Sequence, residues 1–382
     1  MDGTSQPTGA EITQAAETDD RRSINTTMVA CKRIRMGVFF DGTGNNRFLV
    51  GTPGFDGWHT NIDFLEQAYK ETTEVMNGCN VTHAHVYVMG IGTDKTGTYT
   101  RGMALGLGKT GVYQRTLEAI EEIEGVLKST SDGELQAAIE FDVFGFSRGA
   151  AAARYFANLV NNGEAFGNQF GPTKVKFLGI FDTVGSTGIP GNEAEVIDIS
   201  TSAATAEHIV HITADSEFRE NFPLTLARVG QRIRMVGAHS DIGGGYGPTD
   251  TSGHVGINNP VVEALIKRDW LSDDEQLQQA NFIMDEMITP GMYRWKAEPG
   301  LSFVALAVMH KLAVDSPTAV PFNSNPHVFP EDLQHLYDSM LSGERLGGRS
   351  NGDIRRKYAH FSIKDSPGMQ AEGDAMRDEF TL

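Results

Sequence analysis

The sequence predicts an α/β protein with a doubly wound, mostly parallel sheet, and three observations lead to this prediction. Five short apolar runs are typical of strands that are buried on both faces, as in parallel sheets. Segments with helical composition and spacing lie between several of these runs, which indicates right-handed β-α-β crossovers. Polar and Gly-rich residues follow the runs directly, and ligands bind outside the carboxyl ends of strands in such sheets.

The expected elements follow one another along the chain. The strands are expected at 33–40, 84–89, 141–144, 175–181 and 232–236. The helices are expected at 62–72, 113–128 and 149–160, with a mostly buried helix at 301–314. Residues 354–363 predict a short strand or the approach to one, and the segments 95–111 and 187–230 are expected to form loops and inserted helices.

The most specific motif lies between the third strand and the helix after it. Residues 145–149 read Gly-Phe-Ser-Arg-Gly, the G-x-S-x-G pattern of a nucleophile elbow. A serine on this turn takes a strained backbone conformation that lifts its hydroxyl clear of the sheet, and the glycines avoid a clash. The motif predicts that Ser147 is the nucleophile of an α/β-hydrolase. The alternative is a Gly-rich turn with an exposed serine.

A serine nucleophile needs a base, and the base needs a carboxylate that fixes its tautomer. Asp182 and His239 each follow an apolar strand, and they obey the chain order serine, acid, histidine of α/β-hydrolases. We therefore expect Ser147, Asp182 and His239 to meet at one rim of the sheet. Asp241 is the alternative acid, and His360 is the alternative base.

The oxyanion formed during acyl transfer needs two aligned N–H donors. Arg148, directly after the nucleophile, is expected to supply one, and the Gly42–Thr43 turn after the first strand the other. The Asp41 side chain should point elsewhere and tie this loop down, because a carboxylate beside an oxyanion is unfavourable. The loop lacks the Lys-Ser/Thr pair of a P-loop, so nucleotide binding is not expected. The mechanism requires no metal and no cofactor.

Two further features concern a substrate. Arg148 and Arg154 lie at the start of the helix after the elbow, where they either attract an anionic group such as a phospholipid head group or form salt bridges. The apolar, Gly-rich run 102–108 suits a lid or an edge that touches lipid, and packing on the sheet explains it equally well.

Composition narrows the class of partner. The 382 residues include 32 Lys and Arg against 50 Asp and Glu, which gives a net charge of −18. This charge disfavours nucleic-acid binding and simple electrostatic adhesion to an anionic bilayer. Cys31 and Cys79 have no zinc-site spacing, and two reduced thiols are expected, with one bridge as the alternative.

The ends of the chain suggest its organisation. Residues 1–30 are rich in Thr, Ser, Asp, Glu and Gly and predict a flexible tail, and residues 31–382 predict one α/β-hydrolase domain with cap-like insertions. No Sec signal peptide is expected, because no basic segment followed by an apolar one is visible at the start. No apolar stretch of 18 residues predicts a transmembrane helix.

Four motifs in this order resemble the type VI secretion lipase effectors, α/β-hydrolases with a GFSRG elbow: VFFDGTGNN (38–46), GFSRGAAAAR (145–154), GIFDTVGS (179–186) and GAHSDIGGGY (237–246). The resemblance spans roughly residues 35–325. It implies a triad of Ser147, Asp182 and His239, and hydrolysis of phospholipid acyl esters at the A1 or A2 position. It also implies transport on the secretion spike to the envelope of rival bacteria, and an immunity protein in the producer.

The functional prediction is therefore a serine hydrolase that cleaves phospholipid acyl esters as an antibacterial effector. It is made in the cytoplasm without a Sec signal, delivered to the target-cell envelope, and touches membrane peripherally. The alternatives are an esterase that acts on a non-lipid ester and an inactive hydrolase fold that serves as a binding module.

Overall fold

In the computed structural model the chain divides into two units, Met1–Ala30 and Cys31–Leu382. The structure describes residues 31–55, 57–98, 110–130, 137–186, 197–217, 219, 222–247, 253–256, 278–284, 287–295, 297–323, 328–344 and 348–360, with backbone alone between 253 and 295. The expected tail 1–30 and the Gly-rich run 102–108 lie outside the described residues, so the roles assigned to them stay predictions.

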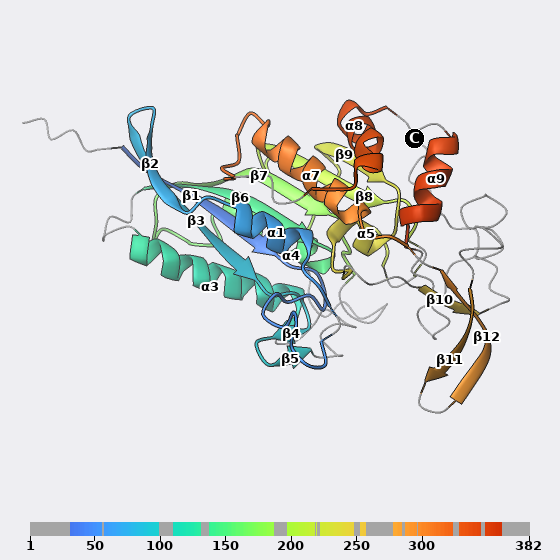
Figure 1. Cartoon of the computed structure of the whole chain (residues 1–382). Helices are drawn as coiled ribbons and strands as arrows, with labels where there is room; N and C mark the ends of the chain where they lie inside the picture. Colours follow the sequence, from blue (N-terminus) through green and yellow to red (C-terminus); the bar gives the residue numbers. More distant parts are fainter. Residues whose placement is uncertain are drawn as a thin grey trace, which may run out of the picture. The chain divides into compact units, whose positions relative to one another are not determined.

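The main sheet of the described chain has seven strands in the order β2-β3-β1-β6-β7-β8-β9 (Figure 1). Their bounds are β1 Cys31–Phe40, β2 Thr72–Met76, β3 Cys79–Val88, β6 Ala138–Phe146, β7 Thr173–Phe181, β8 His208–Ala214 and β9 Gln231–Met235. Only the pairing of β2 with β3 is antiparallel within this sheet. The predicted fold class, a mostly parallel doubly wound α/β sheet, is confirmed.

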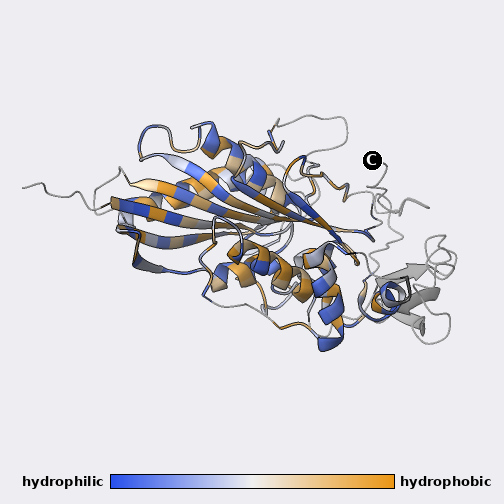
Figure 2. Cartoon of the chain, turned by 90° about the horizontal axis from the view of Figure 1, so that it is seen from above, coloured by the Kyte–Doolittle hydropathy of each residue, from blue (hydrophilic) through white to orange (hydrophobic). Residues whose placement is uncertain are grey.

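Helices cover both faces of the sheet (Figure 1). One face packs against α1 (Asn61–Ala68) and α7 (Leu301–Val314), and the other packs against α3 (Val112–Thr130) and α4 (Arg148–Asn161). Alternate residues of one strand point to opposite cores: Phe39 belongs to the first, and Val38 and Phe40 belong to the second. In Figure 2 hydrophobic positions accordingly run along the strands and the helices that cover them.

The remaining described elements belong neither to the main sheet nor to the four helices named above. They are β4 Thr93–Asp94, β5 Gly97–Thr98, α5 His239–Gly243, β10 Gly253–Gly256, β11 Gln278–Met284, β12 Met287–Trp295, the 3-10 helix η2 Glu331–Leu333, α8 Gln334–Ser342 and α9 Gly348–Tyr358. β10, β12 and β11 form an antiparallel sheet in that order. None of the described helices combines the length and the apolar character that crossing a bilayer requires.

Two expectations about secondary structure are wrong. The segment expected to hold only loops and helices contains β8, a buried strand between β7 and β9. Its two histidines hid the strand pattern, but His211 lies fully buried between the backbone amides of Thr183 and Ala227. Residues 354–358, expected to form a short strand or the approach to one, are instead the end of α9, where the buried side chains of Ile354 and Tyr358 are four residues apart on one helix face. Residues 361–363 of that prediction lie outside the described residues.

The expectation of two reduced thiols is also wrong, because Cys31 and Cys79 form a disulfide. The two residues are direct partners in the parallel pairing of β1 with β3, and their Cα atoms are 4.5 Å apart. This distance falls in the range that a disulfide bridges. Their sequence separation of 48 positions gave no sign of this proximity, which the strand register creates.

The sheet topology determines where functional side chains can gather. The chain lays β3 on one side of β1 and β6 on the other, so the strand order reverses at β1. The loops after β1 and β6 therefore leave neighbouring strand ends in opposite directions, and ligands of open α/β sheets bind beside such a reversal, at the carboxyl edge. Asp41, Ser147 and Asp182 directly follow β1, β6 and β7 at this edge.

Candidate active site

Ser147 occupies a strained turn between β6 and α4. Its backbone has φ 59° and ψ −129°, a conformation that L residues rarely adopt. A Cβ atom at Gly145 would lie 2.6 Å from the Gly149 carbonyl oxygen, so the turn excludes a side chain there. The Ser147 N–H donates to Phe181 O at 3.0 Å, which joins the turn to the end of β7. The local geometry is that of a nucleophile elbow.

Asp182 and His239 are in direct contact. The His239 Nδ1 lies 2.6 Å from Asp182 Oδ2, and the Ala214 N–H donates to Asp182 Oδ1 at 2.9 Å. Asp182 is 0% exposed and His239 is 3% exposed. Both carboxylate oxygens are thus engaged in a buried site, and the carboxylate fixes the tautomer with the proton on Nδ1.

The surroundings of His239 favour its neutral form. Burial lowers the pKa of His239 below its ordinary value of 6.5, although the hydrogen bond and the charge of Asp182 act in the opposite direction. The imidazole centroid is 4.6 Å from that of Phe146 and 4.9 Å from that of Phe222. A neutral imidazole with its proton on Nδ1 leaves Nε2 as the proton acceptor that a general base requires.

The structure joins two of the three expected triad residues by a hydrogen bond. Within the described chain, the buried Ser147 Oγ has no hydrogen-bond partner, and so it makes no such bond to His239. The ring of Phe146, the residue before the serine, nevertheless packs against the imidazole. Catalytic hydrogen bonds are often long in a free enzyme and shorten with substrate.

The alternative triad residues, Asp241 and His360, pair with each other. His360 Nδ1 lies 2.7 Å from Asp241 Oδ1, and the His360 N–H donates to Asp241 Oδ2 at 2.9 Å. Asp241 Oδ2 also accepts from the Ala238 N–H at 2.8 Å. These bonds occupy both oxygens of Asp241, whereas His239 takes Asp182 as its partner.

The loop after β1 contributes one available amide. The Gly42 N–H donates to Asp41 Oδ1 at 2.7 Å, so this expected oxyanion donor is engaged within its own loop. The Thr43 N–H donates to no other residue that the structure describes. Arg148 reaches across the site, where its Nη1 donates to Thr43 Oγ1 at 3.3 Å and its Nε to Ser186 O at 3.0 Å. The side chain of Arg148 thereby links the elbow to the candidate oxyanion loop.

The Asp41 side chain is tied away from this amide, in agreement with the expectation. Its Oδ1 accepts from the Thr60 hydroxyl at 2.7 Å, and its Oδ2 accepts from the Tyr87 hydroxyl. Burial raises the pKa of Asp41 from 3.8 to about 6, although these hydrogen bonds act in the opposite direction.

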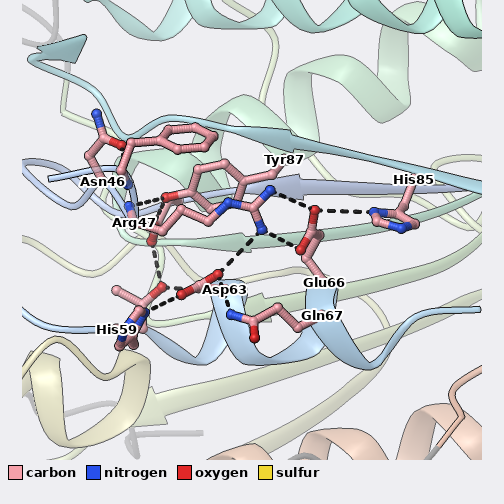
Figure 3. Close-up of polar contacts among 11 residues, drawn as sticks. Asn46, Arg47, His59, Asp63, Glu66, Gln67, His85 and Tyr87 are labelled. Carbon is pink, nitrogen blue, oxygen red and sulfur yellow. Dashed lines mark hydrogen bonds and ion pairs between the residues drawn. The ribbon is translucent and has the colours of Figure 1, made fainter. Parts of the chain in front are cut away.

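A polar network extends from Tyr87 behind the loop (Figure 3). The Tyr87 hydroxyl accepts from the Arg47 N–H at 3.0 Å, and the Arg47 guanidinium lies 4.2 Å from the Tyr87 ring centroid. Arg47 forms a two-point ion pair with Glu66 on α1, and Glu66 also contacts His85 at 3.1 Å. The network fastens the loop to α1 and β3.

Arg154 does not have either of its expected roles. Its guanidinium is buried and donates to the carbonyl oxygens of Ile199, Thr225 and Leu226. It therefore supports the segments that pack on α4. Among the described residues, no cluster of three or more His, Cys, Asp or Glu side chains could hold a metal ion.

Two residues of the candidate site that lie beside His239 were not predicted from the sequence. Glu217 accepts the His239 N–H at 3.2 Å, and Arg219 pairs with Glu217 through two bonds of 2.8 Å. They follow β8, the strand that the sequence did not reveal. Recognising β8 from the apolar residues of 208–214 would have placed both at the same rim.

The fold and this constellation define a class, the α/β-hydrolases with a serine at the elbow and a buried Asp–His pair. The comparisons with known proteins narrow this class. The family model "T6SS, Phospholipase effector Tle1-like, catalytic domain" matches residues 164–267, a range that includes Asp182 and His239 and begins after Ser147. Over these residues, the chain is similar to the catalytic domain of Tle1-like phospholipase effectors.

One solved structure supports this fold. The chain is similar to "Structure of the Tle1 effector bound to the VgrG spike from the Type 6 secretion system", with a TM-score of 0.61 and 23% identity over 87% of this chain and 85% of that chain. An uncharacterized protein from Pseudomonas aeruginosa matches with a TM-score of 0.48 and 18% identity over 85% of this chain and 53% of that chain. No curated protein matches the sequence. The predicted resemblance to type VI secretion lipase effectors is confirmed.

Proposed function

We propose that the protein hydrolyses acyl esters of phospholipids through a covalent acyl-enzyme on Ser147. The contact of His239 Nδ1 with Asp182 Oδ2 at 2.6 Å is the observation that carries this proposal. A buried carboxylate in this position orients the imidazole and stabilises the imidazolium that forms when the serine loses its proton. The strained backbone of Ser147 supports its assignment as the nucleophile.

The reaction proceeds in two acyl transfers. His239 Nε2 takes the proton from Ser147 as Oγ attacks the ester carbonyl, and it then returns the proton to the departing lysophospholipid oxygen. In the second half, His239 takes a proton from water as the water attacks the acyl-enzyme carbonyl. The bond to Ser147 Oγ then breaks, His239 gives the proton to Oγ, and a fatty acid is released. Asp182 stays ionised throughout.

The oxyanion is stabilised by two backbone donors. We assign them to the N–H groups of Arg148 and Thr43, because the first begins α4 and the second donates to no other described residue. The hydrogen bond between the side chains of the same two residues keeps the second amide close to the elbow. Gly42 instead maintains the shape of the loop through its bond to Asp41.

The comparisons with known proteins support the proposed substrate class and route of delivery. The family model that matches this chain is that of a phospholipase effector, and the similar Tle1 effector is bound to a VgrG spike. We propose that this protein also travels on a secretion spike to the envelope of a target cell. An immunity protein in the producing cell and peripheral membrane contact belong to the same proposal.

The test compares the wild-type protein with Ser147→Ala on vesicles of mixed phospholipids. Fatty acid and lysophospholipid should appear with the wild type alone, and the position of the remaining acyl chain distinguishes A1 from A2 cleavage. A fluorophosphonate probe should label the wild type at Ser147 and leave Ser147→Ala unlabelled. Equal product from both proteins, or none from either, would contradict the phospholipase proposal.

The alternatives have their own signatures in these assays. An esterase for a non-lipid substrate would be labelled and would cleave a short soluble ester, but it would leave vesicles intact. An inactive binding module would show neither labelling nor hydrolysis. Circular dichroism of Ser147→Ala checks that the loss of activity is not a loss of fold.

A further inference from the structure

Three consecutive backbone amides at the turn of the candidate base each donate to a different carboxylate. The Gly237 N–H donates to Asp215 Oδ1 at 3.3 Å, and the Ala238 N–H donates to Asp241 Oδ2 at 2.8 Å. The third donor is the His239 N–H, which contacts Glu217 Oε2 at 3.2 Å. We call the carboxylates of Asp215, Glu217 and Asp241 the amide cradle.

Each carboxylate of the amide cradle is also bound to a basic side chain. Asp215 accepts a two-point bond from Arg355, and Glu217 accepts one from Arg219. The partner of Asp241 is His360, with its Nδ1 at 2.7 Å.

Five of the six side chains belong to buried residues, and Arg219 is partly buried. Asp241 is 2% exposed, and Glu217 and Arg355 are each 3% exposed. Burial alone would raise the pKa of Glu217, but the neighbouring guanidinium of Arg219 holds this pKa below its ordinary value. Removing such a partner would leave a buried charge without compensation and would strongly destabilise the folded protein.

Two of these basic partners come from the last described segment of the chain. Arg355 lies on α9, and His360 is the second residue after that helix. Arg355 Nη1 additionally donates to Ser216 Oγ at 2.6 Å, and the Ser216 N–H donates to Gly237 O at 3.0 Å. The end of α9 is thereby bonded to residues on either side of the turn that carries His239.

We propose that the amide cradle positions His239 for catalysis and that the C-terminal segment completes it, so that Glu217, Arg219, Arg355 and His360 are positioning residues of the active site. The proposal deepens the proposed function and rests on it. The imidazole must meet Asp182 at Nδ1 and Ser147 at Nε2, and an error of about 1 Å in such an arrangement can cost about a hundredfold in rate. Bonds to three successive amides leave the backbone of the turn little freedom to move.

This role differs from ordinary structural support in its electrostatic consequence. The charged groups around His239 are Asp182, Glu217 and Arg219, and the Asp215–Arg355 ion pair and the hydrogen-bonded pair of Asp241 with His360 lie adjacent to its turn. The negative charge of Glu217 raises the pKa of His239, and the positive charge of Arg219 lowers it. A change in Glu217 should therefore move the acid limb of the pH–rate profile, which reports the protonation of the base.

The experiment measures kcat, KM and the pH dependence of kcat/KM on a short soluble ester. Glu217→Gln retains an oxygen that can accept the His239 N–H but removes the charge and exposes the imidazole to Arg219. We expect the acid limb to move to lower pH by about one unit, by a charge–charge interaction at this range. The double variant Glu217→Gln/Arg219→Gln should move the limb back toward the wild-type position.

The contribution of α9 is tested with Arg355. Arg355→Gln leaves Asp215 without its guanidinium, and we expect kcat to fall about tenfold or more while KM stays unchanged. Arg355→Lys retains a positive charge and should recover part of that loss. A purely structural role would lower the melting temperature in both variants without this division between kcat and KM.

The matched control is Asp142→Asn, which breaks another buried carboxylate–arginine pair. Asp142 accepts two hydrogen bonds of 2.7 Å from Arg35 and one of 2.8 Å from Tyr69. It lies on β6, five residues before Ser147, which corresponds to about 16 Å along the strand. This variant should lower the melting temperature and leave the acid limb in place. Should Glu217→Gln fail to fold, the Arg355 pair decides the question.

The outcomes separate this inference from the proposed function. Suppose that the probe labels the wild-type protein at Ser147. An unchanged acid limb in Glu217→Gln, or an unchanged kcat in Arg355→Gln, then overturns the inference about the amide cradle and leaves the proposed function in place. Wild-type protein that is not labelled at Ser147 overturns the proposed function, and the inference falls with it. A shifted acid limb that the double variant restores, together with a control that shows no shift, supports the cradle.

Discussion

Replacing Asp182 by Asn tests the contact on which the proposed function depends. The substitution keeps the shape of the side chain but leaves it one acceptor oxygen and one NH2 group. In the structure both oxygens of Asp182 accept hydrogen bonds, from His239 Nδ1 at 2.6 Å and from the Ala214 N–H at 2.9 Å. The oxygen of an Asn can satisfy only one of these two donors.

The two donors are not equivalent, and the difference determines the outcome. The Ala214 N–H is a buried backbone donor, and leaving it without an acceptor costs about 1–3 kcal/mol. The imidazole of His239 avoids a comparable cost by changing its tautomer. We therefore expect the oxygen at position 182 to face Ala214 and the NH2 group to face Nδ1, which moves the imidazole proton to Nε2 and removes the base.

The expected loss of kcat is about 10⁴-fold, the value for the same substitution in another Ser-His-Asp hydrolase. It corresponds to about 5.5 kcal/mol in activation free energy. The assay is steady-state hydrolysis of a soluble ester by the wild type and Asp182→Asn, with Ser147→Ala as the background. Thermal unfolding by circular dichroism confirms that the variants are folded. A folded Asp182→Asn variant that keeps about a tenth of the wild-type kcat would refute the reasoning.

Three further predictions concern the protonation of Asp41, the Cys31–Cys79 disulfide and the close approach at Gly149. Burial raises the pKa of Asp41 from 3.8 to about 6, so this group stabilises the folded state below about pH 4, and that contribution of about 3 kcal/mol is lost as the pH rises through 6. In Asp41→Asn the free energy of unfolding, measured in urea at pH 4 and pH 7, should fall less over this range than in the wild type; an identical fall contradicts the assignment. Reducing the Cys31–Cys79 disulfide, which closes a loop of 48 residues, should lower stability by about 4 kcal/mol in the chain-entropy account while activity at 25 °C persists, because both cysteines lie at the ends of β1 and β3 opposite the candidate site. A melting temperature unaffected by dithiothreitol would argue against that bridge. Gly149→Ala places a Cβ atom 2.2 Å from Asp41 O and should slow fluorophosphonate labelling and destabilise the fold by about 1–3 kcal/mol, whereas Gly125→Ala on α3, where no atom lies within 4 Å, should stabilise it by about 0.5–1 kcal/mol. Equal effects of the two glycine variants would show that the close approach at the elbow is unimportant.

The main elements of the fold could be predicted because their signals are local. The strands expected at 33–40, 141–144 and 175–181 correspond to β1, β6 and β7, with ends that differ by a few residues. A short apolar run bounded by polar residues suffices to identify a buried strand. β8 was not predicted because two histidines interrupt its apolar pattern. One of them, His211, is buried and accepts hydrogen bonds from loops that lie far away in sequence.

The candidate site could be predicted in part for a related reason. In a parallel sheet, residues that follow successive strands share one edge, and so Asp182 and His239 could be expected to meet without knowledge of their distance. The partners of Asp241 and His360 could not be inferred in this way. These two residues are 119 positions apart, and their pairing depends on how the segment that follows α9 lies against α5.

By itself, the sequence determined the class of fold, the elbow at Ser147 and the order of the candidate catalytic residues, because backbone strain and burial patterns act over a few neighbouring residues. Only the tertiary structure decided that Gly42 is engaged by Asp41, that Cys31 pairs with Cys79, and that Glu217 contacts the amide of His239. Each of these contacts requires an orientation or a strand register that is set by the packing of the whole sheet. Hydrogen bonds and disulfides depend on distances of a few ångströms, and residue spacing along the chain does not specify such distances.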